Sequence, residues 1–204
     1  MNPSMVTGMS LDKWRHYARA RLFEIVGRPA DAIVEFKRAL QFDPDFRKAA
    51  NALGYRYAQL GRHSEAVGWF ERVVRLDATD AIAHYNLGFS YDKAGDPRKA
   101  IERFRSTVEL LPRLDRAWYG MGLSHAALGE HREAMEAFDR AARLQPMSSP
   151  VWYQLGMAAH HANEPERVRH VIHHVNRFDP RMAKRLILDT GSTDLAYLVK
   201  DLVV

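Results

Sequence analysis

A single interval governs this sequence: when the chain is aligned with itself at a shift of 34 residues, residues of one kind fall into columns. Small residues form one column, which reads Ala20, Gly54, Gly88, Gly122 and Gly156. A second column reads Ala32, Ala66, Ala100, Ala134 and Val168, and a third reads Phe36, Phe70, Phe104, Phe138 and Ile172. Such a chain folds by stacking copies of one supersecondary unit.

Each copy contains a turn with a helix on either side. A residue type that tolerates positive φ recurs between the first two columns, at Gly27, Gly61, Gly95, Gly129 and Asn163. Before the second of these turns, Leu53 and Tyr57 share one face of a helix, and after it Ala66, Phe70 and Val73 do the same. Prolines end most segments, where a missing N–H does least harm. The pattern therefore predicts an all-α fold with two helices per copy.

These columns resemble the tetratricopeptide repeat, whose pattern has a bulky residue, a Leu-Gly pair, an alanine, an aromatic residue and a terminal proline. The fourth segment carries this pattern as Trp118, Met121-Gly122, Ala134, Phe138 and Pro146. The first copy departs from it at Arg19, and the fifth at Asn163 and Val168. The resemblance implies a right-handed superhelical solenoid of five helix-turn-helix repeats with a C-terminal capping helix.

The columns place the repeats at 13–46, 47–80, 81–114, 115–148 and 149–182, between a flexible N-terminal tail at 1–12 and a capping segment at 183–204. In the capping segment, Ser192 or Asp194 is expected to start a helix. Its apolar face consists of Leu195, Leu198, Val199 and Leu202. A solenoid needs its last apolar face covered, which favours capping; dimerisation through this segment is the alternative.

The resemblance also implies a non-enzymatic protein–protein interaction scaffold, in which the first helix of each repeat lines a concave groove. A peptide or protein segment with apolar anchors is expected to contact Tyr17, Arg21, Lys48, Asn51, Tyr55, Tyr85, Asn86, Phe89, Arg116, Tyr119, Leu123, Tyr153, Gln154 and Met157. Four tyrosines in register favour a binding surface, although packing between neighbouring helices is the alternative for each ring. The chaperone-tail clamp of some family members is disfavoured, because Asn51, Tyr55 and Gly120 stand where lysine, asparagine and arginine are required.

The charge pattern allows a second function, that of a single-stranded RNA-binding helical repeat protein. The net charge is +5 and the isoelectric point about 9.5, but the 30 basic residues are interspersed with 25 acidic ones. The groove cations are Arg21, Lys48, Lys93 and Arg116. Nucleic acid is therefore the less favoured partner, and a salt titration separates the two functions.

Catalytic and metal-binding patterns are weak in this sequence. Ser124 and His125 are adjacent, so on a helix they point about 100° apart and form no nucleophile and base pair. Five histidines cluster late in the chain, at His160, His161, His170, His173 and His174, but no carboxylate or cysteine joins them at motif spacing. We therefore expect no enzyme activity, no metal and no cofactor. The first residues lack the apolar run of a secretory signal, which predicts a cytoplasmic protein without a membrane partner.

Overall fold

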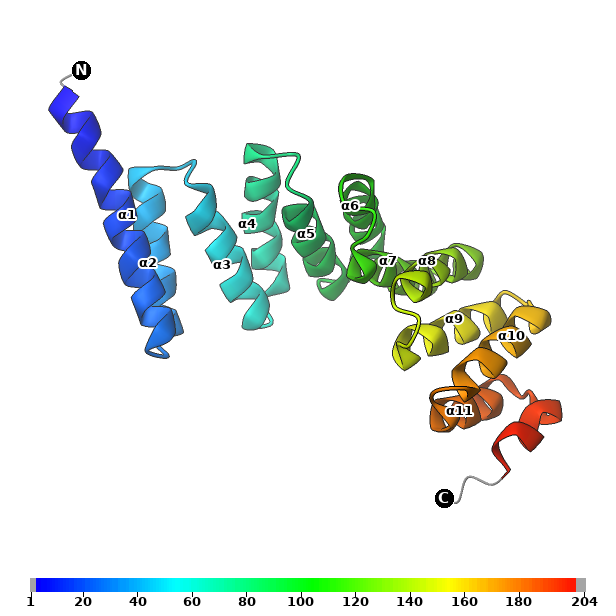
Figure 1. The fold of residues 1–204 in the computed structure, drawn as a ribbon. Coiled ribbons are helices and arrows are strands. Elements are labelled where there is room, and N and C mark those ends of the chain that lie inside the picture. The colour runs from blue at the N-terminus through cyan, green and yellow to red at the C-terminus, as the bar shows by residue number, and fades with distance from the viewer. Residues whose placement is uncertain (1–2, 201–204) are drawn as a thin grey trace. The chain divides into compact units, whose positions relative to one another are not determined.

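A computed structural model describes the backbone of residues 3–200 and the side chains of residues 11–200. Every element of the described backbone is a helix, as the sequence predicts, and consecutive helices pack together within two compact units (Figure 1). The N-terminal unit, Met1–Asp96, contains α1 (Pro3–Ile25), α2 (Pro29–Phe42), α3 (Arg47–Gln59), α4 (His63–Leu76) and α5 (Ala81–Lys93). The C-terminal unit, Pro97–Val204, contains α6 (Pro97–Leu110), α7 (Asp115–Ala127), α8 (His131–Leu144), α9 (Ser149–His161), α10 (Pro165–Asn176), α11 (Pro180–Thr190) and the 3₁₀ helix η1 (Thr193–Val199). The all-α prediction is confirmed.

The turns between the helices of each hairpin are the ones that the glycine positions predict. After α3, Gly61 has φ +71°, and the Arg62 N–H donates to the Tyr57 carbonyl oxygen over 2.9 Å. This backbone bond satisfies a carbonyl that the helix end would otherwise leave without a partner. Asn163 takes the same conformation after α9, with φ +58°, and is the one described non-glycine residue that does so. Asparagine tolerates the left-handed region, so the turn survives the substitution.

Some glycines without positive φ serve a different purpose, which is close packing against a phenylalanine. In the N-terminal unit, a Cβ atom on Gly54 of α3 would lie 2.7 Å from a ring carbon of Phe70 on α4. In the C-terminal unit, a Cβ on Gly122 of α7 would meet the Phe138 ring at the same distance. The small-residue column therefore lets the two helices of a hairpin approach, because a side chain there would occupy the place of the ring.

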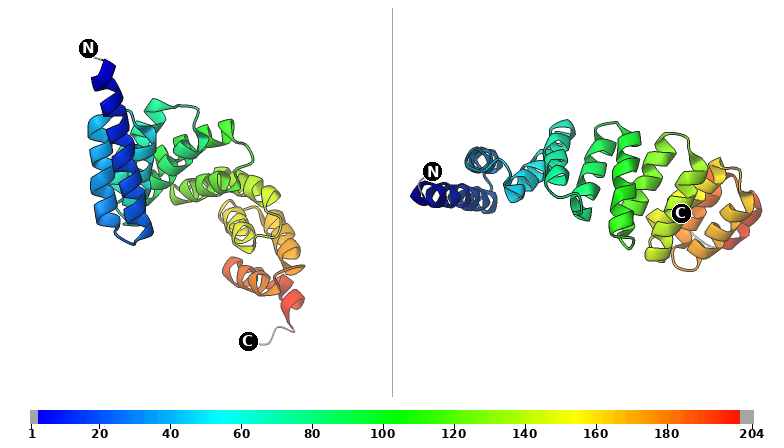
Figure 2. Two further views of the ribbon diagram at one scale, coloured as in Figure 1. Left: turned by 60° about the vertical axis from the view of Figure 1, so that its left-hand side comes forward. Right: turned by 90° about the horizontal axis from the view of Figure 1, so that it is seen from above.

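The first helix is longer than its repeat. Helix α1 begins at Pro3 and so continues through residues 3–12, where the sequence pattern predicted a flexible tail. Helices α1 and α2 lie side by side (Figure 2), and this packing stabilises the later turns of α1. Once a helix is nucleated, each further residue adds a backbone hydrogen bond, which accounts for the extension. Residues 1–2 lie outside the described backbone.

The C-terminal end of the repeats is covered by two elements. Helix α11 begins at Pro180 behind the cap residue Asp179, whose carboxylate accepts a hydrogen bond from the Met182 N–H at 3.0 Å. The segment after it is a 3₁₀ helix, where the sequence predicted a longer regular helix. Its Leu195 and Val199 side chains are 3% and 7% exposed and join the core of the C-terminal unit. Leu202 lies outside the described residues, and dimerisation through this segment stays a prediction.

Candidate functional site

A hollow of about 280 Å³ lies between the first helices of the first two repeats in the N-terminal unit. The predicted groove residues of these repeats all line it. They are Tyr17 and Arg21 from α1, with Lys48, Asn51 and Tyr55 from α3. The other lining residues are Glu24, Ala52, Arg56 and Gln59. Ala52, Arg56 and Gln59 were missed by the sequence reasoning, although Ala52 and Arg56 lie one helical turn apart on the edge of the same face.

The charges in this hollow are organised around one carboxylate. Glu24 forms ion pairs with Arg21 on its own helix and with Arg56 on α3, whose Nε lies 2.6 Å from Glu24 Oε1. The Lys48 ammonium lies 5.0 Å from the centre of the Trp14 ring, in cation–π contact. Three cations therefore face one carboxylate, and the surplus positive charge favours an acidic group on a ligand.

Tyr55 and Phe89 are exposed aromatic side chains of this surface, at 43% and 40%, as is Trp14 at 44%. The Tyr55 ring stands edge-on to Phe70, with ring centres 5.7 Å apart, and its hydroxyl accepts a hydrogen bond from Asn86 Nδ2 over 3.1 Å. Asn86 is only 7% exposed. The structure therefore makes Asn86 a support for Tyr55, and its amide does not reach out to solvent.

The tyrosine column has a packing role. Tyr17 is half-buried, with ring centres 5.5 Å from Phe36 and 5.3 Å from Phe46. In the C-terminal unit, Tyr119 is half-buried 5.6 Å from Phe138. Tyr85 on α5 is also half-buried. Tyr17 and Tyr119 thus pack against phenylalanine rings while each stays partly exposed, and ligand binding by this column stays a prediction.

The remaining predicted residues lie on α7 and α9 of the C-terminal unit. Arg116 is exposed, whereas Leu123, Gln154 and Met157 are half-buried. The Tyr153 hydroxyl donates to Asp189 Oδ2 of α11 over 2.7 Å, and the Arg185 guanidinium lies 4.9 Å from the centre of the Tyr153 ring. The hydrogen bond to the Asp189 carboxylate raises the pKa of Tyr153. Capping helix α11 thereby engages this tyrosine, a contact that sequence spacing could not indicate.

The late histidines serve packing in part. His174 stacks near Trp152, with ring centres 4.0 Å apart, and its Nε2 lies 3.2 Å from the Pro146 carbonyl oxygen. Partial burial, together with nearby positive groups such as Arg167, lowers the pKa of His170. Across residues 11–200, no three histidine or acidic side chains come together as ligands for a metal ion.

None of the described helices combines the length and the apolar character that crossing a bilayer requires.

Helical hairpins that recur at a fixed interval and stack on their neighbours define the class of α-helical repeat proteins. Within that class, a family model described as "TPR repeat" matches residues 54–95, and one described as "Tetratricopeptide repeat" matches residues 85–149 and 119–167. The chain belongs to the tetratricopeptide repeat family. Proteins of this family are generally non-enzymatic interaction scaffolds.

Solved structures show the same fold. A crystal structure of MamA is 24% identical, with a TM-score of 0.75, and the match covers 81% of this chain and 96% of that one. The structure of YrrB, described as a TPR protein with an unusual peptide-binding site, is 22% identical over 83% of this chain and 89% of that one, with a TM-score of 0.74. MamA from Desulfovibrio magneticus RS-1 is 19% identical over 83% and 96%, with a TM-score of 0.75. No curated protein matches the chain.

Proposed function

We propose that this protein is a non-enzymatic scaffold that binds a peptide or protein segment along the first helices of the N-terminal unit, with the cytoplasm as its predicted location. The observation that carries the proposal is Tyr55, an exposed aromatic ring at the edge of a hollow, held in place by the buried Asn86 amide. An oriented ring loses little conformational entropy on binding, so it is an efficient anchor. The peptide-binding site described for YrrB supports the same class of ligand.

The ligand fits the chemistry of the surface. An apolar side chain would contact Tyr55 and the exposed edge of Tyr17, while an acidic neighbour would face Arg21 and Lys48. Because Glu24 is bonded to both Arg21 and Arg56, it offsets one of the three positive charges and leaves a small positive surplus. This balance supports a peptide with few charges over the phosphate backbone of RNA, which needs many unpaired cations.

The test compares the wild-type protein with a Tyr55→Ala, Phe89→Ala double variant. Partners are captured from the source cell, and the segment that binds is synthesised and titrated by fluorescence anisotropy. An anchoring aromatic residue contributes about 2 kcal/mol, so losing two should weaken binding about a hundredfold or more. Added salt should change the affinity little, whereas an RNA ligand would be released steeply.

Tyr197→Ala is the matched control, since Tyr197 is a more exposed tyrosine, 60% accessible, on η1 of the C-terminal unit. It should bind as the wild type does. Melting followed by circular dichroism shows whether the double variant stays folded. If the folded double variant binds every captured segment as tightly as the wild type, this surface is not the binding site.

A further inference from the structure

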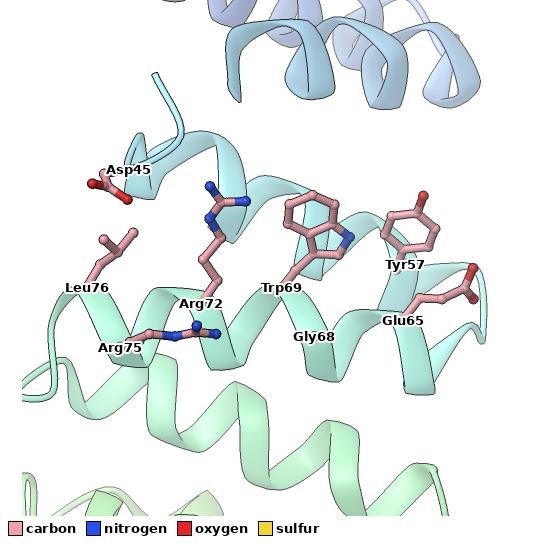
Figure 3. Close-up of a pocket in the computed structure, with 8 residues that line it drawn as sticks. All are labelled: Asp45, Tyr57, Glu65, Gly68, Trp69, Arg72, Arg75 and Leu76. Carbon is pink, nitrogen blue, oxygen red and sulfur yellow. The ribbon is translucent and has the colours of Figure 1, made fainter. Parts of the chain in front are cut away.

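A second hollow, of about 570 Å³, lies in the N-terminal unit along helix α4 (Figure 3). It is lined by Asp45, Tyr57, Glu65, Gly68, Trp69, Arg72, Arg75 and Leu76. None of these residues lines the hollow between α1 and α3. Trp69 and Arg72 project from α4 toward the same side, and Tyr57 of α3 stands beside the Trp69 ring (Figure 3). The peptide surface proposed above makes no use of this place.

Gly68 forms the floor of this second hollow and has no packing reason to be glycine. It lies in the middle of α4 with ordinary helical φ, and a Cβ added there would meet nothing within 4 Å. Glycine inside a helix is destabilising relative to alanine. In contrast, Gly54 of the neighbouring helix leaves room for Phe70. At Gly68 the missing side chain leaves open space instead.

The repeat framework does not require this glycine or the tryptophan beside it. At the interval of the repeats, the positions equivalent to Gly68 hold Val34, Glu102, Glu136 and His170. The positions equivalent to Trp69 hold Glu35, Arg103, Ala137 and Val171. The Gly-Trp pair therefore belongs to α4 alone among the repeats and forms a local feature that stacking the repeats does not demand.

Two polar groups of the second hollow lack partners. The indole N–H groups of Trp118 and Trp152 donate to the Pro112 and Pro146 carbonyl oxygens, over 2.9 and 2.8 Å. Trp69 is half-buried against the core of the unit, yet its N–H finds no acceptor among the described residues. The Arg75 guanidinium likewise finds no carboxylate there. Both groups are available to a bound molecule.

The charge of the second hollow is positive once internal pairs are considered. Arg62 Nε donates to Glu65 Oε2 over 2.8 Å, so this carboxylate is already neutralised. Arg72 donates to the carbonyl oxygen of Pro44, a neutral group, and so keeps its full charge. Among the lining carboxylates, Asp45 is left to oppose Arg72 and Arg75. Asp43, which also lies near Arg72, is paired with Lys13. The hollow thus combines an aromatic wall, an open floor and two guanidinium groups with positive charge to spare.

We propose that the second hollow binds a partner segment in which an aromatic or aliphatic side chain stands next to an acidic residue. The apolar side chain lies over Gly68 against the Trp69 ring, and the carboxylate accepts hydrogen bonds from Arg72 and Arg75. A backbone carbonyl of the segment accepts from the Trp69 N–H. Guanidinium groups hold carboxylates in this way through paired, charge-assisted hydrogen bonds.

A phage-displayed library of random dodecapeptides, selected on the full-length protein, tests the proposal. Peptides that compete with one another, and whose binding changes a tryptophan fluorescence signal that Trp69→Phe abolishes, should carry an acidic residue beside an aromatic or aliphatic one. Their affinity should fall about tenfold or more, or 1.4 kcal/mol, in Gly68→Leu, which fills the floor, and in Arg75→Glu. It should stay within about twofold in Glu102→Leu, which places the same leucine side chain at the equivalent position of α6, and in Tyr55→Ala.

Other results overturn the proposal. These are a selection that enriches no peptide, enriched peptides without acidic residues, or binding that survives both Gly68→Leu and Arg75→Glu. Peptides that no longer bind Tyr55→Ala but still bind Gly68→Leu would support the hollow between α1 and α3 and reject the second hollow. The two proposals can therefore fail separately. Arg75 is exposed, and its replacement keeps the test valid even where Gly68→Leu lowers the melting temperature.

Discussion

Two glycine-to-alanine changes in adjacent helices should alter stability by different amounts. At Gly54 the new methyl carbon would lie 2.7, 2.8 and 2.9 Å from three carbons of the Phe70 ring, whereas carbon atoms in contact normally stay about 3.5–4.0 Å apart. The ring is 1% exposed, so it is enclosed by the close-packed core. At Gly68 the same methyl group would meet nothing within 4 Å.

The comparison isolates the packing term. Each change gains about 1 kcal/mol of helix propensity, so this gain cancels between the two variants. Overpacking of a close-packed core costs about 1–3 kcal/mol. We expect Gly68→Ala to be up to about 1 kcal/mol more stable than the wild type, and Gly54→Ala to be about 1–3 kcal/mol less stable than Gly68→Ala.

Thermal unfolding followed by circular dichroism measures the difference, at about 2–4 °C per kcal/mol for a chain of this size. In the C-terminal unit, Gly122→Leu places a side chain against the Phe138 ring, and its free energy of unfolding should likewise fall by about 1–3 kcal/mol. If Gly54→Ala and Gly68→Ala melt at the same temperature, the ring yields to the methyl group. The close approach of α3 to α4 would then not explain the small-residue column.

Two carboxylates provide further predictions. Burial disfavours the ionised form of Glu35, but hydrogen bonds from His16 and Arg38 outweigh it and hold its pKa below 4.5. The ionised Glu35 carboxylate therefore stabilises the fold above about pH 4.5, and this stabilisation is lost as the pH falls further. In Glu35→Gln, the free energy of unfolding measured with urea should decrease less on acidification than it does in the wild type. Asp179→Ala removes the cap of α11 and its bond to Ser149, and should cost about 0.5–2 kcal/mol in the same assay; an unchanged midpoint would contradict the capping role.

The sequence by itself determined the helices, the turns and the packing columns. The positive φ of Gly61 and the contact of Gly54 with Phe70 follow from residue size and helical spacing, which act over a few residues and repeat at each hairpin. The candidate surface between α1 and α3 followed for the same reason, because side chains one turn apart share a face. What recurs at a fixed interval is visible in a single sequence.

Only the tertiary structure decided which side chains meet across that framework. Asn86 turns to the Tyr55 hydroxyl, and Tyr153 is engaged by Asp189 of the capping helix, through contacts between residues 31 and 36 positions apart. The second hollow likewise exists because Gly68 is open to solvent, which its place in a helix does not reveal. Local rules set where each side chain starts, but its partners depend on how neighbouring helices approach one another, and that is settled only when the whole unit packs.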